Sequence, residues 1–195
     1  MQKGNEDPKW VNEQDRLSKG YLLQVNSRIA ELKSKLGSYS DALTSFSQIL
    51  QVNEMRLDIQ VAAANVYMQW GSQLQVTDKT NASKQFVAAI GGGFPKADEV
   101  AGNIVWGWKK IAKLTQGNAK FREEFFEARY NLALARYQYA KLRTSEKPKY
   151  LGYAEQEIKN TQLIVKDLGN WKPRFEALLK QVQKDLKKPQ VGFDE

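Results

Sequence analysis

The chain of 195 residues is 42% hydrophobic and 27% charged, a composition typical of one globular domain and not of a disordered segment. It contains no cysteine and no histidine, which excludes thiol nucleophiles, thiolate zinc sites and imidazole bases or ligands, so we expect neither an enzyme nor a cofactor. The formal net charge of +8 favours anionic partners, either acidic protein segments or nucleic acid.

The sequence leaves the compartment of the chain open. No stretch approaches the roughly 18 apolar residues that a transmembrane helix needs, so we expect no membrane insertion. The absence of cysteine is compatible with a reducing or an oxidising compartment. A cytoplasmic location is favoured if Met1 is the native start, and a periplasmic one fits if the chain is a fragment of a longer protein. The sequence does not indicate an oligomeric state.

Helical spacing of apolar residues predicts four helices in the first half of the chain. The first runs from about Pro8 to Leu36, and Gly37 ends it. The second covers about 39–53, the third about 55–74 and the short fourth about 80–90. The first helix carries an apolar stripe made of Leu22, Val25, Ile29, Leu32 and Leu36.

Four more helices are predicted in the second half. The glycines at 91–93 and Pro95 are expected to end the fourth helix, and a fifth is predicted from about Ala97 to Leu114. The sixth covers about 119–143, the seventh about 150–168, and the eighth begins near Pro173. The sixth carries two adjacent apolar stripes, which indicates two packed neighbours. Residues 188–195 are expected to form a flexible tail.

Several of these residues match the signature of a known repeat. Ala64 and Tyr67 fit a first helix at a period of about 34 residues from the preceding pair, and Tyr130 to Ala133 fits another. A turn and second helix are matched by Gly37, Tyr39, Ala42 and Phe46, and later by Ala82, Phe86 and Ala89. In these positions the chain resembles the tetratricopeptide repeat family, over about residues 23–90 and 126–165.

The resemblance implies an all-α fold, an α-α superhelix of the TPR-like solenoid type with about eight antiparallel helices. Residues 1–195 would form a single domain, with two helix pairs at 8–90 and later pairs and a capping helix at 97–187. A plain helical bundle is the alternative. A β-sheet, or helices wrapped around one enclosed centre, would contradict the solenoid.

The resemblance also implies a function: a scaffold that binds a peptide or protein segment on the concave face lined by the first helices. Asparagine side chains can clamp a peptide backbone because they both donate and accept hydrogen bonds. The alternative is that these positions are merely solvated. Competing functions are a basic nucleic-acid-binding helical module and a structural element of a larger chain. The predicted contact residues are Arg28, Glu31, Asn65, Gln69, Trp108, Tyr130, Asn131 and Gln138.

Arginines recur every seven residues on the predicted sixth helix, at 122, 129, 136 and 143, and so lie nearly on one face. Arg129 and Arg136 have no acidic residue three or four positions away in that helix. One interpretation pairs them with Glu155 or Glu157 of the seventh helix, or lets the guanidinium groups reach water. The other assigns them to an acidic partner, so Arg129 and Arg136 join the candidate partner-binding residues.

We expect two further clusters of residues to have structural roles. Glu123, Glu124 and Glu127 lie near a helix start, where negative charge is favourable, and an acid/base pair is not expected. Trp106 and Trp108 stand among lysines, but residues two apart on a helix point in different directions. We therefore expect core packing of these tryptophans in preference to base stacking.

Overall fold

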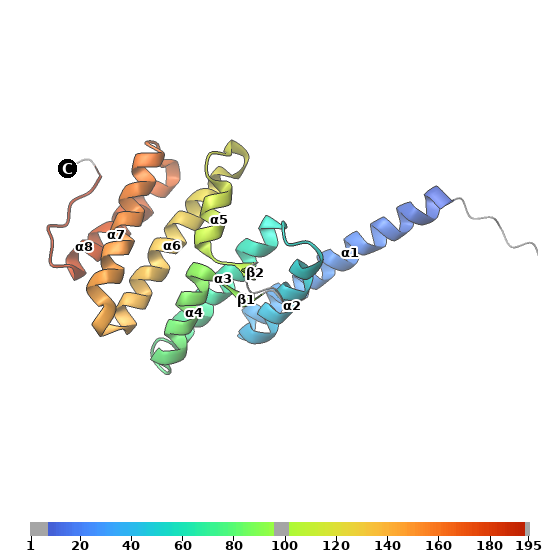
Figure 1. The fold of residues 1–195 in the computed structure, drawn as a ribbon, viewed down its shortest axis with the longest axis horizontal. Helices are drawn as coiled ribbons and strands as arrows, with labels where there is room; N and C mark the ends of the chain where they lie inside the picture. The colour runs from blue at the N-terminus through green and yellow to red at the C-terminus, as the bar shows by residue number, and fades with distance from the viewer. Residues whose placement is uncertain (1–7, 96–101, 194–195) are drawn as a thin grey trace, which may run out of the picture.

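The computed structural model describes residues 8–95 and 102–193. In these residues it contains eight α-helices and one two-stranded antiparallel sheet (Figure 1). The strands are β1 (Gly92–Pro95) and β2 (Asn103–Trp106). The helices are α1 (Pro8–Lys35), α2 (Tyr39–Val52), α3 (Leu57–Leu74), α4 (Lys79–Gly91), α5 (Trp108–Thr115), α6 (Arg122–Leu142), α7 (Lys147–Ile164) and α8 (Lys172–Asp185).

Local signals place most helix ends where the sequence predicts them. Gly37 ends α1 with a φ of 81°, and Ser38 N donates to Lys33 O while Gly37 N donates to Ser34 O, the Schellman arrangement. Asp78 caps α4 by accepting a hydrogen bond from Asn81 N at 3.0 Å. The seventh helix begins earlier than predicted because Pro148 lies in its first turn, where proline is tolerated, instead of in the preceding connection; it also ends earlier, at Ile164.

The predicted fifth helix from Ala97 to Leu114 is wrong over residues 103–106, which form β2 and pair with β1. Its residues 97–101 lie outside the described part of the chain, and α5 begins only at Trp108. The strand is held by Gln60 of α3, whose Nε2 donates to Ile104 O at 3.0 Å and whose Oε1 accepts from Trp106 N at 2.7 Å. This buried amide satisfies backbone groups that a helix would have satisfied internally.

The sheet departs from the all-α expectation, and by the criterion stated above it counts against the solenoid. The other regular elements of the described chain are helical, so the helical architecture holds while the solenoid arrangement does not follow from it. Each strand has four residues, and the pair lies against α2, α3 and α4 without separating the helices. Gly107 follows β2 directly, and a Cβ atom there would lie 2.4 Å from Gly92 N and Ile90 O. The absence of a side chain at Gly107 therefore permits the close approach that joins the hairpin to the end of α4.

The buried apolar residues fall into two clusters that meet at α6. Ala128, Leu132 and Ala135 belong to the cluster that α2 to α5 form, and α6 contacts α3, α4 and α5 of that group, whereas Phe126 and Tyr137 belong to the cluster of α7 and α8. The two stripes predicted on this helix are therefore confirmed as two packed sides. Neighbouring helices pack in succession along the long axis of the molecule (Figure 1).

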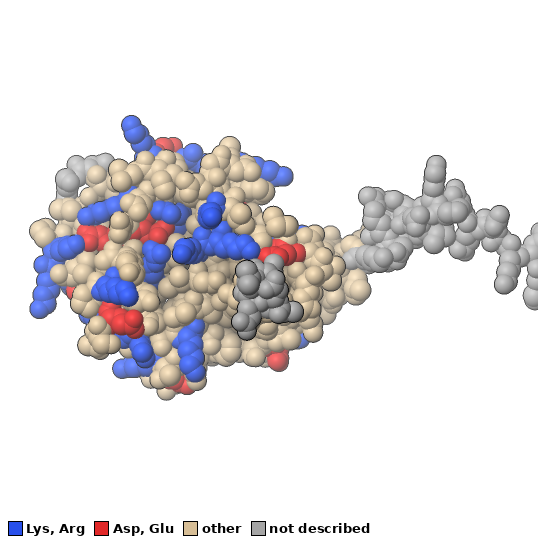
Figure 2. Space-filling model, viewed as in Figure 1, with Lys and Arg blue, Asp and Glu red and all other residues tan. Residues whose placement is uncertain are grey.

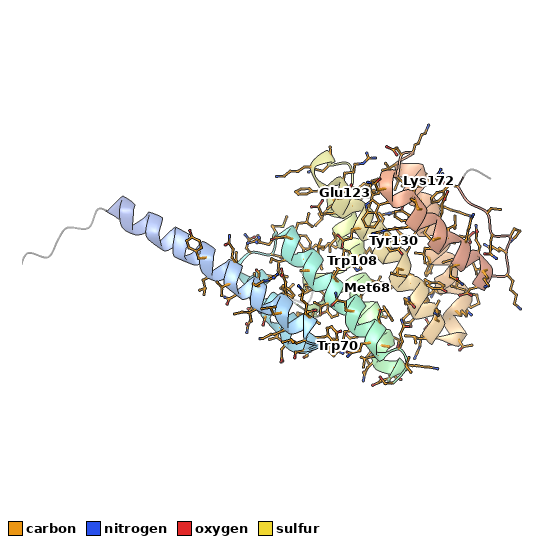
Figure 3. All side chains as sticks on the ribbon, turned by 180° about the vertical axis from the view of Figure 1, so that it is seen from behind. Met68, Trp70, Trp108, Glu123, Tyr130 and Lys172 are labelled. Carbon is orange, nitrogen blue, oxygen red and sulfur yellow. The ribbon has the colours of Figure 1, made fainter. Side chains whose placement is uncertain are left out.

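Helices α1, α3, α6 and α8 follow one another along one side of the molecule, each in contact with the next. Figure 3 shows α3 and α8 towards the viewer, and Figure 1 shows the other side, with α4, α5 and α7 in front. The N-terminal part of α1 extends away from the rest of the fold. In the described part of the chain, no helix combines the length and the apolar character required to cross a membrane.

Candidate peptide-binding face

Four of the predicted contact residues come together where α1 meets α3. Glu31, Asn65 and Gln69 line a pocket of about 200 Å³ between these helices. Arg28, one turn earlier on α1, forms an ion pair with Glu31 at 2.7 Å. The remaining lining residues are Ser34, Lys35, Phe46, Ala62 and Val66. The pocket therefore has an apolar floor and a rim that carries amide, hydroxyl and charged groups.

Small side chains on α1 bring this helix close to its neighbours. Ser27, Ala30 and Ser34 recur at helical spacing and are all buried. Ser34 Oγ donates to Gln69 Oε1 at 3.0 Å, which fixes the orientation of the Gln69 amide. The pocket is thus positioned by close contact of α1 with α3.

The amides of Asn65 and Gln69 each engage only one of their two polar groups, the NH2 or the C=O, inside the described part of the protein. Asn65 Nδ2 donates to Glu127 Oε1 at 3.0 Å, and Gln69 Oε1 accepts from Ser34. Within residues 20–95 and 102–193 nothing hydrogen-bonds to Asn65 Oδ1 or Gln69 Nε2. An acceptor and a donor therefore stand one helical turn apart at the rim, which suits the N–H and C=O groups of a peptide backbone.

The face continues onto α6. Besides the Asn65 contact with Glu127, Nε2 of Gln75, the residue that follows α3, donates to Gln138 Oε1 at 3.1 Å. Asn131 lies four residues after Glu127 and seven before Gln138, so the three share one side of α6. We call the surface formed by Glu31, Asn65, Gln69, Asn131 and Gln138 the amide face.

Tyr130 borders the amide face but is engaged in packing. Its ring centroid lies 5.9 Å from that of Trp171 and 5.6 Å from that of Phe175, in an edge-on arrangement with the latter (Figure 3). Trp171 Nε1 donates to Glu123 Oε2 at 2.9 Å. These contacts join α6 to α8. They explain the presence of an aromatic side chain at position 130 without a bound partner protein.

Arg129 and Arg136 lie on the opposite side of α6 from the amide face and contact α7. Arg129 Nη1 is 2.7 Å from Glu157 Oε1, and Arg136 Nη1 is 2.5 Å from Glu157 Oε2. Arg129 Nε also donates to Thr161 Oγ1 at 2.8 Å. Pairing with a carboxylate of the seventh helix, one of the two interpretations from the sequence, is therefore confirmed for Glu157.

This cluster of two arginines and one glutamate is nearly enclosed. The side chain of Arg129 is 13% exposed and that of Glu157 is 9% exposed. Burial lowers the pKa of Arg129, the negative charge of Glu157 opposes this shift, and the positive charge of Arg136 adds to it. Neither guanidinium group stands on the amide face, so we assign both arginines to the α6 and α7 interface.

Other residues that the sequence suggested for binding or ion pairing also make contacts within the protein. Trp108 is 0% exposed and belongs to the first core cluster, so the expectation that it contacts a partner is wrong. Arg122 donates to Asp167 O at 2.6 Å, and Glu155, the other carboxylate considered for the arginines, binds Lys159 and Lys188. The part of the chain that the structure describes holds no cluster of three or more acidic residues placed to bind a metal ion.

The sequence interpretation missed Ser34 and Glu127, which orient the two amides. The signal for Ser34 was the small-residue row Ser27, Ala30 and Ser34, which marks the side of α1 that packs closely. No local pattern identifies Glu127 as the partner of Asn65, because the two are 62 residues apart.

Comparison of the chain with models of known protein families, with curated proteins and with solved structures gives no match.

Proposed function

We propose that this protein is a TPR-like helical repeat scaffold, without enzymatic activity, that binds an extended segment of another protein across α1, α3 and α6. The amide face carries this proposal. Its acceptor on Asn65 and donor on Gln69 stand over a pocket with an apolar floor, which suits a peptide that offers backbone groups and one small apolar side chain.

The TPR-like arrangement is supported by how small and large residues meet. Ala42, Ala63, Ala64 and Ala82 are fully buried, and Phe46 and Phe86 belong to the same core cluster as the first three of these alanines. Gly71 leaves room for the Phe86 ring, since a Cβ atom at Gly71 would lie 3.0 Å from it. Consecutive helices that pack closely through small residues form an extended stack, and an extended stack offers a long binding surface.

Charge favours an acidic segment as the partner. The chain has a net charge of +8, and Lys35 lines the pocket beside the two amides. Nucleic acid is the competing partner for a basic protein. Figure 2 shows the side formed by α4, α5 and α7, away from the amide face; there lysines and arginines are interspersed with carboxylates, so that side offers nucleic acid no continuous basic stripe.

Affinity capture from the source cell tests the proposal. Wild-type protein is compared with the double variant Asn65→Ala, Gln69→Ala, and with the matched variant Gln51→Ala, Asn160→Ala, whose amides are exposed on α2 and α7. We expect at least one captured protein to fall tenfold or more with the first variant and to be retained with the second. Equal recovery with both variants would contradict a role of the amide face.

A parallel titration separates the competing function. Labelled RNA and DNA are added to the wild-type protein at two salt concentrations, because phosphate contacts weaken steeply as salt rises. We expect only weak binding that Asn65→Ala, Gln69→Ala leaves unchanged. If the protein binds nucleic acid tightly and in a salt-sensitive way, and captures no protein, the scaffold proposal is wrong and the protein is a nucleic-acid-binding module.

A further inference from the structure

The side of α1 that faces away from the fold is apolar. Its stripe consists of residues spaced by three and four, and it remains largely exposed: Leu22 is 61% exposed and Leu36 is 83% exposed. The side of α1 that packs on the protein is instead formed by small residues, Ser27, Ala30 and Ser34. The full stripe, as predicted from the sequence, is Leu22, Val25, Ile29, Leu32 and Leu36.

A groove of about 550 Å³ runs between this stripe and α2. Leu22 and Ile29 line it from α1, and Ile49 and Val52 line it from α2. Val52 is 85% exposed although it ends a helix whose other apolar residues are buried. Water therefore covers a continuous apolar surface shared by two helices, which is the usual mark of a binding site.

The packing of the later helices indicates what fits this groove. The pair α3 and α4 is covered on its preceding side by α2, and the pair α6 and α7 is covered there by α4 and α5. The pair α1 and α2 lies at one end of the stack, and no helix in the described ranges covers its outer side (Figure 1). A helix with apolar residues at steps of three and four would repeat the contact already made twice inside the molecule.

The charged residues around the stripe indicate which kind of helix would bind in the groove. Among the residues whose side chains the structure describes, Lys33 is the only charged one that lines the groove, and its Nζ lies 3.0 Å from Ser45 Oγ. A second copy of the chain would bring the Lys33 side chains of the two molecules towards one another, whereas a helix with a carboxylate beside its apolar stripe would pair with Lys33.

We propose that the groove between α1 and α2 is a second docking site, which binds an amphipathic helix of a partner protein with acidic residues beside its apolar stripe. This site is separate from the amide face. Glu31 and Lys35 project from α1 towards the pocket, while Ile29 and Lys33 project towards the groove, on another side of the same helix.

A designed peptide pair tests the site. The acidic probe is a 21-residue peptide with leucine at heptad positions a and d and glutamate at e and g, and the control carries lysine at e and g. Like charges at e and g disfavour self-association of either peptide. By fluorescence anisotropy we expect the full chain to bind the acidic peptide at least tenfold more tightly than the basic one.

Variants locate the binding and identify other occupants. Leu22→Glu and Ile29→Glu change exposed positions, and each is expected to reduce binding of the acidic peptide tenfold or more without loss of helicity. Asn65→Ala, Gln69→Ala is expected to leave this binding unchanged, which keeps the test independent of the proposed function. Equal binding of both peptides, binding of neither, or a dimer in sedimentation that Ile29→Glu dissociates would overturn the proposal.

Discussion

Arg136 Nη1 lies 2.5 Å from Glu157 Oε2, while Arg129 Nη1 lies 2.7 Å from the other oxygen of the same carboxylate. One acidic side chain of α7 thus holds two basic side chains of α6. Because all three groups are largely removed from water, their charges interact more strongly than those of a surface ion pair. The stability of the α6 and α7 contact should depend on Glu157 more than on any exposed carboxylate.

Replacement of Glu157 by glutamine should therefore destabilise the protein. Removing one partner of a buried pair leaves uncompensated charge, and we expect the free energy of unfolding to fall by about 3 kcal/mol, near the lower end of the range for such pairs. Urea denaturation followed by circular dichroism measures this loss. Asp167→Asn is the control, because its pair with Arg122 is exposed and should contribute less than about 1 kcal/mol. Equal losses in the two variants would contradict the special role of Glu157.

Gln60 should determine whether β2 stays attached to α3. Gln60→Leu keeps a similar volume but leaves Trp106 N–H and Ile104 C=O without the hydrogen bonds that the amide supplies. We expect a loss of about 2–6 kcal/mol, from about 1–3 kcal/mol for each of the two unsatisfied groups, and faster hydrogen exchange at Trp106. Exchange at Ile158 of α7, in the other core cluster, serves as the reference. Unchanged exchange at Trp106 would show that the strand is held by other contacts.

Two glycines should respond in opposite directions to replacement by alanine. At Gly107 a Cβ atom would lie 2.4 Å from backbone atoms of Ile90 and Gly92, so Gly107→Ala should destabilise by about 1–3 kcal/mol through overpacking. Gly152 lies inside α7 with nothing within 4 Å of the added atom, and Gly152→Ala should stabilise by about 0.5–1 kcal/mol. Thermal denaturation of both variants measures the two effects. A stabilised Gly107→Ala variant would contradict the close approach.

Stability should fall in acid partly through Glu155. Burial would raise the pKa of Glu155, but hydrogen bonds from Lys159 and Lys188 outweigh it and hold the pKa below the ordinary value of 4.5. The unfolded chain then takes up a proton first as the pH falls, so this contribution is complete above about pH 4.5 and is lost as the pH drops through the lower, folded-state pKa. Urea denaturation should show Glu155→Gln less stable than wild type at pH 7, with a smaller difference at pH 3. A difference of the same size at both pH values would contradict the linkage.

Much of the helical architecture could be predicted from the sequence, because local signals specify it. Gly37 and Pro173 mark helix ends, and the double stripe of residues 119–143 predicts the two-sided packing of α6. The strand Asn103–Trp106 could not be predicted in the same way. Its backbone is satisfied by Gln60, more than 40 residues earlier, and a distant partner of this kind leaves no periodic pattern.

The candidate site was predictable only in part. Spacing placed Asn65 and Gln69 on one side of a helix, and the structure brings them beside Glu31. Spacing left Trp108 assigned both to the core and to a partner contact, and it left two interpretations open for Arg129 and Arg136, since a helical row shows which residues share a side but not what covers it. The same limit applies to the stripe on α1, which has the spacing of a core face and yet is exposed.

Site-specific photo-crosslinking tests the central claim, that the amide face holds a protein segment, most directly. A photoreactive amino acid is placed at Lys35, which lines the pocket, or at Gln51, which is exposed on α2. In the source cell we expect a crosslinked polypeptide from position 35 that is missing from position 51 and is lost when Asn65→Ala, Gln69→Ala is added. A crosslink from position 35 that the double variant leaves intact, or one to nucleic acid alone, would contradict the account.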